Sequence, residues 1–212
     1  MKEYDFIQPA HLDVLKEIGN IGAGHAATSL SALLGKTIEM SVPEARVIPF
    51  QDLPDRMGGS ENEIAAIYAR IHGDTPGSVY FFSDVSHSES LIQQLTGRPV
   101  YGTDRSSLND YATSAYLETG NIVIGSFLSA FADLTSLTVS RDVPDLSIDM
   151  AGAIISHGLS QLLIQSDVAI FIETQMKIDG EKTSRNFGSI LLLFDPETFD
   201  VLFQSLGVNI DE

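Results

Sequence analysis

The sequence of 212 residues has no cysteine and no tryptophan, and its basic residues are few. The absence of cysteine excludes a disulfide framework, a thiolate metal site and a cysteine nucleophile. Because 29 acidic residues face only 12 basic ones, the formal net charge is −17, which argues against nucleic acid or an anionic membrane as the main partner. No apolar run approaches the roughly 18 residues that span a bilayer, and the first residues do not resemble a signal peptide. We expect a cytoplasmic protein without membrane insertion.

An internal repeat is the most informative feature that the sequence contains. Residues 17–24 read Glu-Ile-Gly-Asn-Ile-Gly-Ala-Gly, and residues 118–125 read Glu-Thr-Gly-Asn-Ile-Val-Ile-Gly. Five of these eight positions are identical, and the offset from 17 to 118 is close to half the chain. Self-similarity at a fixed offset indicates a duplicated structural unit. The repeat predicts one domain, 1–212, made of two similar halves of about 1–103 and 104–212.

Hydrophobic periodicity predicts a long helix in each half, over about 9–34 and 107–132. Shorter helices are expected at about 86–95, at 147–163 and after Pro196. Strand patterns occur at 38–48, 63–72, 78–82, 136–143, 168–177 and 189–194. Tight turns between neighbouring strands favour antiparallel pairing. The expected fold class is α/β (α+β): a single pseudo-two-fold-symmetric domain with a mainly antiparallel sheet and two long repeated helices on it.

Each long helix carries a row of polar residues that ends in glycine. At 100° per residue, the four members of each row fall within about 60° of one another. The first row consists of Asp13, Glu17, Asn20 and Gly24. The second row consists of Ser114, Glu118, Asn121 and Gly125. Since glycine inside a helix costs about 1 kcal/mol relative to alanine, either the two helices pack closely there or a partner approaches the backbone.

The amide and carboxylate of each row favour one kind of chemistry over others. An amide can hold and orient a water molecule but cannot take up a proton, which suits phosphoryl hydrolysis better than acyl or glycosyl transfer. The carboxylate could pair with a lysine of a partner or act as a general base. A solvated polar helix face without chemistry is the alternative. The glycines at 19–24 do not form a dinucleotide-binding loop, because their spacing differs and no strand precedes them.

The two rows together resemble the duplicated signature of the CheC/CheX/FliY family, whose members are phosphatases acting on phosphorylated CheY in chemotaxis. The doubled motif and the chain length are most similar to the CheC branch. The resemblance implies that Asn20 and Asn121 each orient the water that attacks the aspartyl phosphate. It also implies that Glu17 and Glu118 each pair with the active-site lysine of the response regulator.

The resemblance extends to the contact with the response regulator. Asp13 and Ser114 would support that contact, and Gly24 and Gly125 would allow its surface to approach. The Mg²⁺ ion would be held by phosphorylated CheY or a similar response regulator, so no metal or other cofactor is expected on this chain. A non-catalytic adaptor that binds CheY or CheD is the alternative function, because the related FliM middle domain shares the fold without catalysis.

A second segment resembles the part of this family that binds the receptor deamidase CheD. It begins at Asp149, and the residues expected to contact CheD are Asp149, Met150 and Gly152. The match is short, and an ordinary amphipathic helix over the sheet is the alternative.

Overall fold

The computed structural model describes residues 9–101, 109–158, 168–179, 185–194 and 198–205. The helices are α1 (Pro9–Leu34), α2 (Leu53–Arg56), α3 (Val85–Thr96), α4 (Asp110–Thr135), α5 (Ala151–Gly158) and α6 (Thr198–Ser205), with a 3-10 turn η1 (Phe50–Asp52). The strands are β1 (Ile38–Pro49), β2 (Glu63–Gly73), β3 (Gly77–Asp84), β4 (Val139–Arg141), β5 (Asp145–Met150), β6 (Val168–Ile178) and β7 (Arg185–Phe194). None of the described helices combines the length and apolar character needed to cross a bilayer.

Local signals in the sequence set the ends of the long helices. The side chain of Asn109 accepts a hydrogen bond from the main-chain N–H of Ala112, which satisfies one of the free donors at the start of α4. Helix α1 ends at Gly35, whose φ of +65° is the left-handed conformation that glycine adopts without strain. Helix α4 continues beyond the predicted end at residue 132, to Thr135, and closes with Ser136 in the left-handed region.

One predicted helix is wrong in its first part. The sequence pattern predicts a helix over 147–163, but the structure places residues 145–150 in β5, which pairs with β2, and α5 begins only at Ala151. Leu146 and Ile148 are half-buried and alternate with exposed neighbours, which is the two-residue period of a strand. Residues 159–163 and the predicted junction at 102–104 lie outside the described residues. The short segments η1 and α2 were not predicted.

Within the described ranges, the sheet contains seven strands, and every pairing between them is antiparallel. Its order is β1-β6-β7-β3-β2-β4, with β5 also paired to β2. The outer strand β1 therefore lies against β6 of the second half, and β4 and β5 lie against β2 of the first half. Each half thus completes the sheet of the other, and the expected mainly antiparallel sheet is confirmed.

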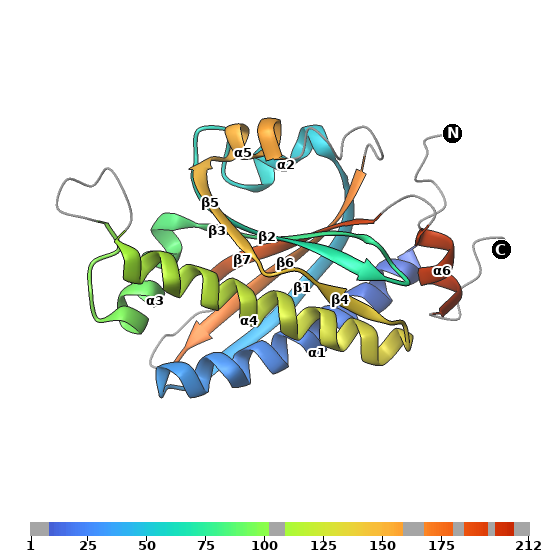
Figure 1. Ribbon diagram of the computed structural model, residues 1–212, viewed down its shortest axis with the longest axis horizontal. Helices are drawn as coiled ribbons and strands as arrows, with labels where there is room; N and C mark the ends of the chain where they lie inside the picture. Colours follow the sequence, from blue (N-terminus) through green and yellow to red (C-terminus); the bar gives the residue numbers. More distant parts are fainter. Residues whose placement is uncertain (1–8, 102–108, 159–167, 180–184, 195–197, 206–212) are drawn as a thin grey trace.

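Helices cover both faces of this sheet. Figure 1 shows α1 and α4 side by side on one face, running in opposite directions, with α2 and α5 on the other face. The larger core lies between the sheet and the two long helices, where Leu15 and Ile18 of α1 and Phe127 and Phe131 of α4 are buried. A second cluster lies beneath α2 and α5 and includes Leu53. Both long helices therefore keep one face for the core and leave the other accessible.

Close packing explains most of the helix glycines. A Cβ atom on Gly22 would lie 2.8 Å from Cα of Phe127, so α1 and α4 approach each other backbone to backbone at this point. Gly19 faces Val42 of β1, and Gly120 faces Ile67 of β2. Gly24 differs, because a Cβ atom there would meet nothing within 4 Å.

Two glycine substitutions two residues apart should therefore have opposite effects. We expect Gly22→Ala to lower the free energy of unfolding by about 1–3 kcal/mol, because the added methyl group collides with the Phe127 backbone. Gly24→Ala should raise it by up to about 1 kcal/mol, because alanine is the better helix former where space is open. Urea unfolding of both variants measures this. A Gly22→Ala protein as stable as Gly24→Ala would contradict the helix crossing.

Candidate functional site

The two polar rows lie on the accessible faces of α1 and α4. In the first row, Asp13, Glu17 and Gly24 are exposed, while Asn20 is half-buried. In the second row, Ser114 and Glu118 are exposed, while Asn121 and Gly125 are half-buried. The rows match in sequence, but the surroundings of their asparagines differ.

The Asn20 side chain is bound to the strand beside it. Its Oδ1 accepts a hydrogen bond from the main-chain N–H of Val42 at 2.9 Å, and its Nδ2 donates to the Val42 carbonyl at 3.4 Å. Its Nδ2 also donates to the carbonyl of Lys16 at 3.1 Å. Val42 lies where the register of β1 against β6 shifts between Ser41 and Glu44. The Asn20 amide therefore satisfies backbone groups that the strand ladder misses at this bulge.

The Asn121 side chain has a different partner. Its Oδ1 accepts a hydrogen bond from Nη2 of Arg141 at 2.5 Å, and the same Nη2 lies 3.4 Å from the Asn121 carbonyl. Among the described residues, Nδ2 of Asn121 has no hydrogen-bond partner. Arg141 also covers Gly125, where a Cβ atom would lie 3.3 Å from Nη2. Partial burial lowers the pKa of the Arg141 guanidinium from its ordinary value, yet arginine stays charged at physiological pH.

The difference between the two rows comes from the sheet edge. Strand β1 continues through its bulge, and Val42 is only 2% exposed. At the matching place in the second half, β4 ends at Arg141 and β5 begins at Asp145, and Val143 between them is 90% exposed. Among the described residues, no hydrogen bond joins the Val143 main chain to Asn121, whereas the Val42 main chain binds the Asn20 amide.

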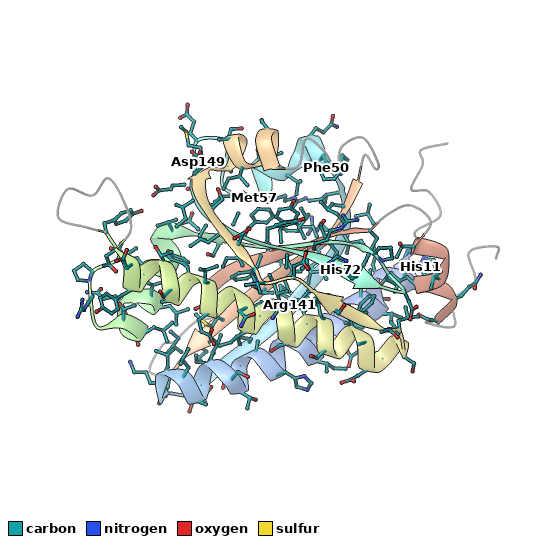
Figure 2. All side chains as sticks on the ribbon, viewed as in Figure 1. His11, Phe50, Met57, His72, Arg141 and Asp149 are labelled. Atoms are coloured by element: carbon teal, nitrogen blue, oxygen red, sulfur yellow. The ribbon has the colours of Figure 1, made fainter. Side chains whose placement is uncertain are left out.

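Two contacts hold the break between β4 and β5 in place. The main-chain N–H of Asp142 donates to the carbonyl of Arg70 at 3.1 Å. The Asp142 carboxylate lies 3.0 Å from Nε2 of His72, which is also on β2. These contacts fix the neighbouring Arg141, which Figure 2 shows beside α4.

A cleft opens where the strand is broken. We call it the second-site cleft; its volume is about 730 Å³, and it is lined by Ser114, Leu117, Glu118, Asn121, Arg141, Asp142, Val143 and Pro144. The structure therefore brings together three of the four residues predicted for the second row. Sequence reasoning missed the contribution of residues 141–144. The pair Val143-Pro144 repeats Val42-Pro43 at the offset of the helix rows, and that repeat could have pointed to this segment.

The site offers a carboxylate, an amide and a guanidinium, and no metal-binding cluster. Within the described ranges, no three histidine, aspartate or glutamate side chains gather closely enough to hold a metal ion. The polar side chains that line the second-site cleft can donate and accept hydrogen bonds and can form ion pairs.

The segment predicted to contact CheD lies on the other side of the sheet. Figure 2 shows Asp149 beside α5, away from Arg141. Asp149 and Met150 are exposed at the end of β5, and the Asp149 carboxylate accepts a hydrogen bond from the Met150 N–H at 2.7 Å. Gly152 is half-buried, and its N–H donates to the carbonyl of Ser60 at 2.9 Å. Gly152, two residues after the exposed pair, thus packs against Ser60.

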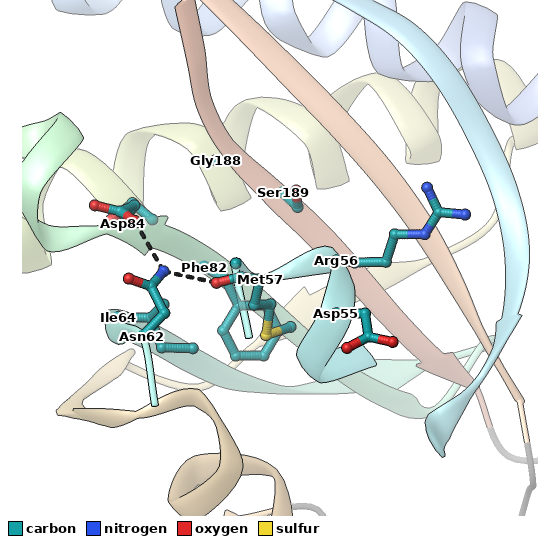
Figure 3. A pocket seen from close by; sticks show the side chains of 11 residues that line it. Asp55, Arg56, Met57, Asn62, Ile64, Phe82, Asp84, Gly188 and Ser189 are labelled. Atoms are coloured by element: carbon teal, nitrogen blue, oxygen red, sulfur yellow. Dashed lines mark hydrogen bonds between the residues drawn. The ribbon is translucent and has the colours of Figure 1, made fainter. Parts of the chain in front are cut away.

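A second, smaller cavity lies on the face of the sheet that carries α2 and α5. Figure 3 shows it beneath α2, and its volume is about 270 Å³. Nδ2 of Asn62 donates to the Met57 carbonyl at 2.7 Å and to Asp84 at 2.8 Å. The carbonyl of Asn62 accepts from the N–H of Ala151 at 2.9 Å. Asn62 therefore connects the wall of this cavity to Ala151, the first residue of α5.

Solved structures of other proteins share this fold. The structure of FliY from Thermotoga maritima superposes with a TM-score of 0.70 at 20% identity, over 95% of this chain and 98% of that one. The FliM middle domain from H. pylori superposes with a TM-score of 0.64 at 9% identity, over 94% of this chain and 99% of that one. The chain therefore has the fold shared by FliY and FliM.

Sequence comparison is more specific. A model of the CheC-like family matches residues 11–46, which contain the first polar row and most of β1, including its bulge. The chain is 36% identical to the CheY-P phosphatase CheC of Bacillus subtilis (strain 168) over 210 residues, which are 99% of this chain and 100% of that protein. This chain belongs to the CheC-like family, and the resemblance noted in its sequence is confirmed.

The two asparagines should differ in their contribution to stability. Asn20→Ala leaves the N–H and carbonyl of buried Val42 without partners, so we expect it to lower the free energy of unfolding by about 1–3 kcal/mol. Asn121→Ala is the matched control, because it makes the same change at the corresponding position of α4 and removes only the half-buried contact with Arg141. Its free energy of unfolding should stay within about 0.5 kcal/mol of that of the unsubstituted protein. Urea unfolding compares them, and equal losses would contradict the distinction.

Proposed function

We propose that this chain is a phosphatase that hydrolyses the aspartyl phosphate of CheY or of a similar response regulator in chemotaxis. One observation carries the proposal: the Asn121 amide and the Glu118 carboxylate line the same cleft, and the amide has N–H donors that no described residue binds. The full-length similarity to a protein named CheY-P phosphatase supports it.

The roles of the second site follow from its chemistry. Glu118 pairs with a lysine of the response regulator and so aligns the phosphorylated aspartate with the cleft. Asn121 holds a water molecule in line with the phosphorus atom, and positioning of this kind supplies most of the catalysis in phosphoryl transfer. Ser114 and Gly125 contact the receiver surface. The Mg²⁺ ion belongs to the response regulator in this proposal, and this chain contributes no metal ligand.

The first polar row, on α1, forms the first site, which has similar residue types but an asparagine with different hydrogen-bond partners. Glu17 is exposed and can pair with a lysine, and Asp13 and Gly24 leave the helix surface open. The Asn20 amide, however, has its hydrogen bonds occupied by Val42 and Lys16. We therefore assign the larger share of hydrolysis to the second site. The adaptor alternative applies best to the first site, which can bind a response regulator while its amide is engaged.

Removing each asparagine should separate the two sites. We expect Asn121→Ala to reduce the accelerated release of phosphate from phosphorylated CheY at least about tenfold, since misplacing an attacking water carries a cost of this order. Asn20→Ala should reduce it less, and the double variant should abolish it. Asp133→Ala, an exposed change on α4 outside the second-site cleft, is the control and should retain full activity. Full acceleration by the double variant would rule out water positioning by these amides.

We also propose that the chain binds the receptor deamidase CheD through the exposed pair Asp149 and Met150 and the neighbouring Gly152. The support is the resemblance of this segment to the family's CheD-binding region, together with the exposure of both side chains at the end of β5.

A charge reversal tests the CheD contact. Asp149→Lys should weaken capture of CheD at least about tenfold, because a reversed charge in a contact costs several kcal/mol, and it should leave phosphate release nearly unchanged. Asp145→Lys is the matched control, because Asp145 is exposed on the same strand and the charge change is the same. A pull-down in which Asp149→Lys retains CheD as well as Asp145→Lys does would remove the assignment.

A further inference from the structure

Arg141 is the one basic side chain among the described residues that line the second-site cleft. It reaches the cleft because β4 ends at this residue, and it lies on the Asn121 amide. The position that matches it in the first half, at the offset of the two rows, is Met40, which can donate no hydrogen bond. The second half therefore has a charged donor at a place where the first half has none.

The contact with Arg141 decides which way the Asn121 amide points. The two ends of a side-chain amide have nearly the same shape, but Oδ1 only accepts hydrogen bonds and Nδ2 only donates them. A guanidinium only donates, so a flipped amide would place donor against donor. Oδ1 must face Arg141, and Nδ2 must then face away from it.

We propose that Arg141 is a positioning residue of the second site. It holds Oδ1 of Asn121 so that the N–H donors of that amide are directed to the water and phosphoryl group that a response regulator brings. This inference rests on the proposed phosphatase function and goes beyond it, because neither the repeated motif nor the role of Asn121 assigns position 141.

The first half, which has Met40 at the position of Arg141, shows how the asparagine amide is bound without an arginine. The peptide of Val42 offers both a donor and an acceptor, and it binds both ends of the Asn20 amide. In the second half, the described Val143 main chain makes no hydrogen bond to Asn121, and Arg141 binds the amide oxygen instead. A cation that binds only the oxygen end fixes the amide and still leaves its N–H groups for a ligand.

Two substitutions of Arg141 test the inference by steady-state hydrolysis of phosphorylated CheY. Arg141→Met places the side chain of the first half in the second and should lower kcat about tenfold, because the amide is no longer fixed; KM should change less than about twofold. Arg141→Lys should recover most of kcat, since an ammonium group can also donate to Oδ1. Arg98→Met is the control for lost charge, because Arg98 lies over Tyr111 outside the cleft, and it should leave kcat unchanged.

Two further measurements separate positioning from other roles. The urea midpoint of Arg141→Met should equal that of the unsubstituted protein. Its preference for beryllofluoride-bound over unmodified CheY should also be unchanged. A lower midpoint with a matching loss of rate would make Arg141 structural. A reduced preference would make it a direct phosphoryl contact, and a raised KM at unchanged kcat would make it a receiver-binding residue; each result overturns the inference.

The same assay distinguishes failure of this inference from failure of the proposed function. If Asn121→Ala loses activity while Arg141→Met keeps it, only the role of Arg141 is wrong. If the unsubstituted protein does not accelerate phosphate release, or if Asn121→Ala is fully active, the proposed role of the second site fails, and the inference about Arg141 fails with it.

Discussion

The pairing of each outer strand with the hairpin of the other half is the constraint on which both polar rows depend. Strand β1 is held by β6 along its length, and β4 and β5 are held by β2. Each long helix then lies beside the outer strand of its own half, so the groups that this strand presents decide what the helix asparagine can bind. A small change in the backbone of the outer strand therefore changes the hydrogen bonds of the asparagine on the helix surface.

The two halves use this arrangement in opposite ways. In the first, a bulge that stays in the sheet presents a peptide to Asn20, and the amide completes the hydrogen bonding of the strand. In the second, the strand breaks, Val143 turns outward and a cleft forms over Asn121. The same amide serves the fold in one half and is available to a ligand in the other. The difference lies in the strand beside the helix and not in the helix motif, whose glutamate, asparagine and glycine are the same in both halves.

The opposite face of the sheet carries a separate set of contacts. Asn62 fixes the loop before β2 to α5, and the exposed pair Asp149 and Met150 lies at the far end of the segment that begins with β4. One continuous edge, residues 139–150, therefore runs from the second-site cleft to the face that carries α2 and α5. The second-site cleft and the exposed pair Asp149 and Met150 therefore belong to separate surfaces of the molecule (Figure 2).

The sequence by itself determined the two long helices, most strands, the duplicated rows and the family, because periodicity, capping and motif spacing are local properties of a chain. It also indicated that the helix glycines needed an explanation, but only the structure assigned Gly22 to the helix crossing and left Gly24 open. The start of β5, the exposure of Val143 and the contact between Arg141 and Asn121 were decided by tertiary structure alone. They depend on which strands lie side by side and in which register, and pairing between distant segments leaves no periodic signal in a single sequence.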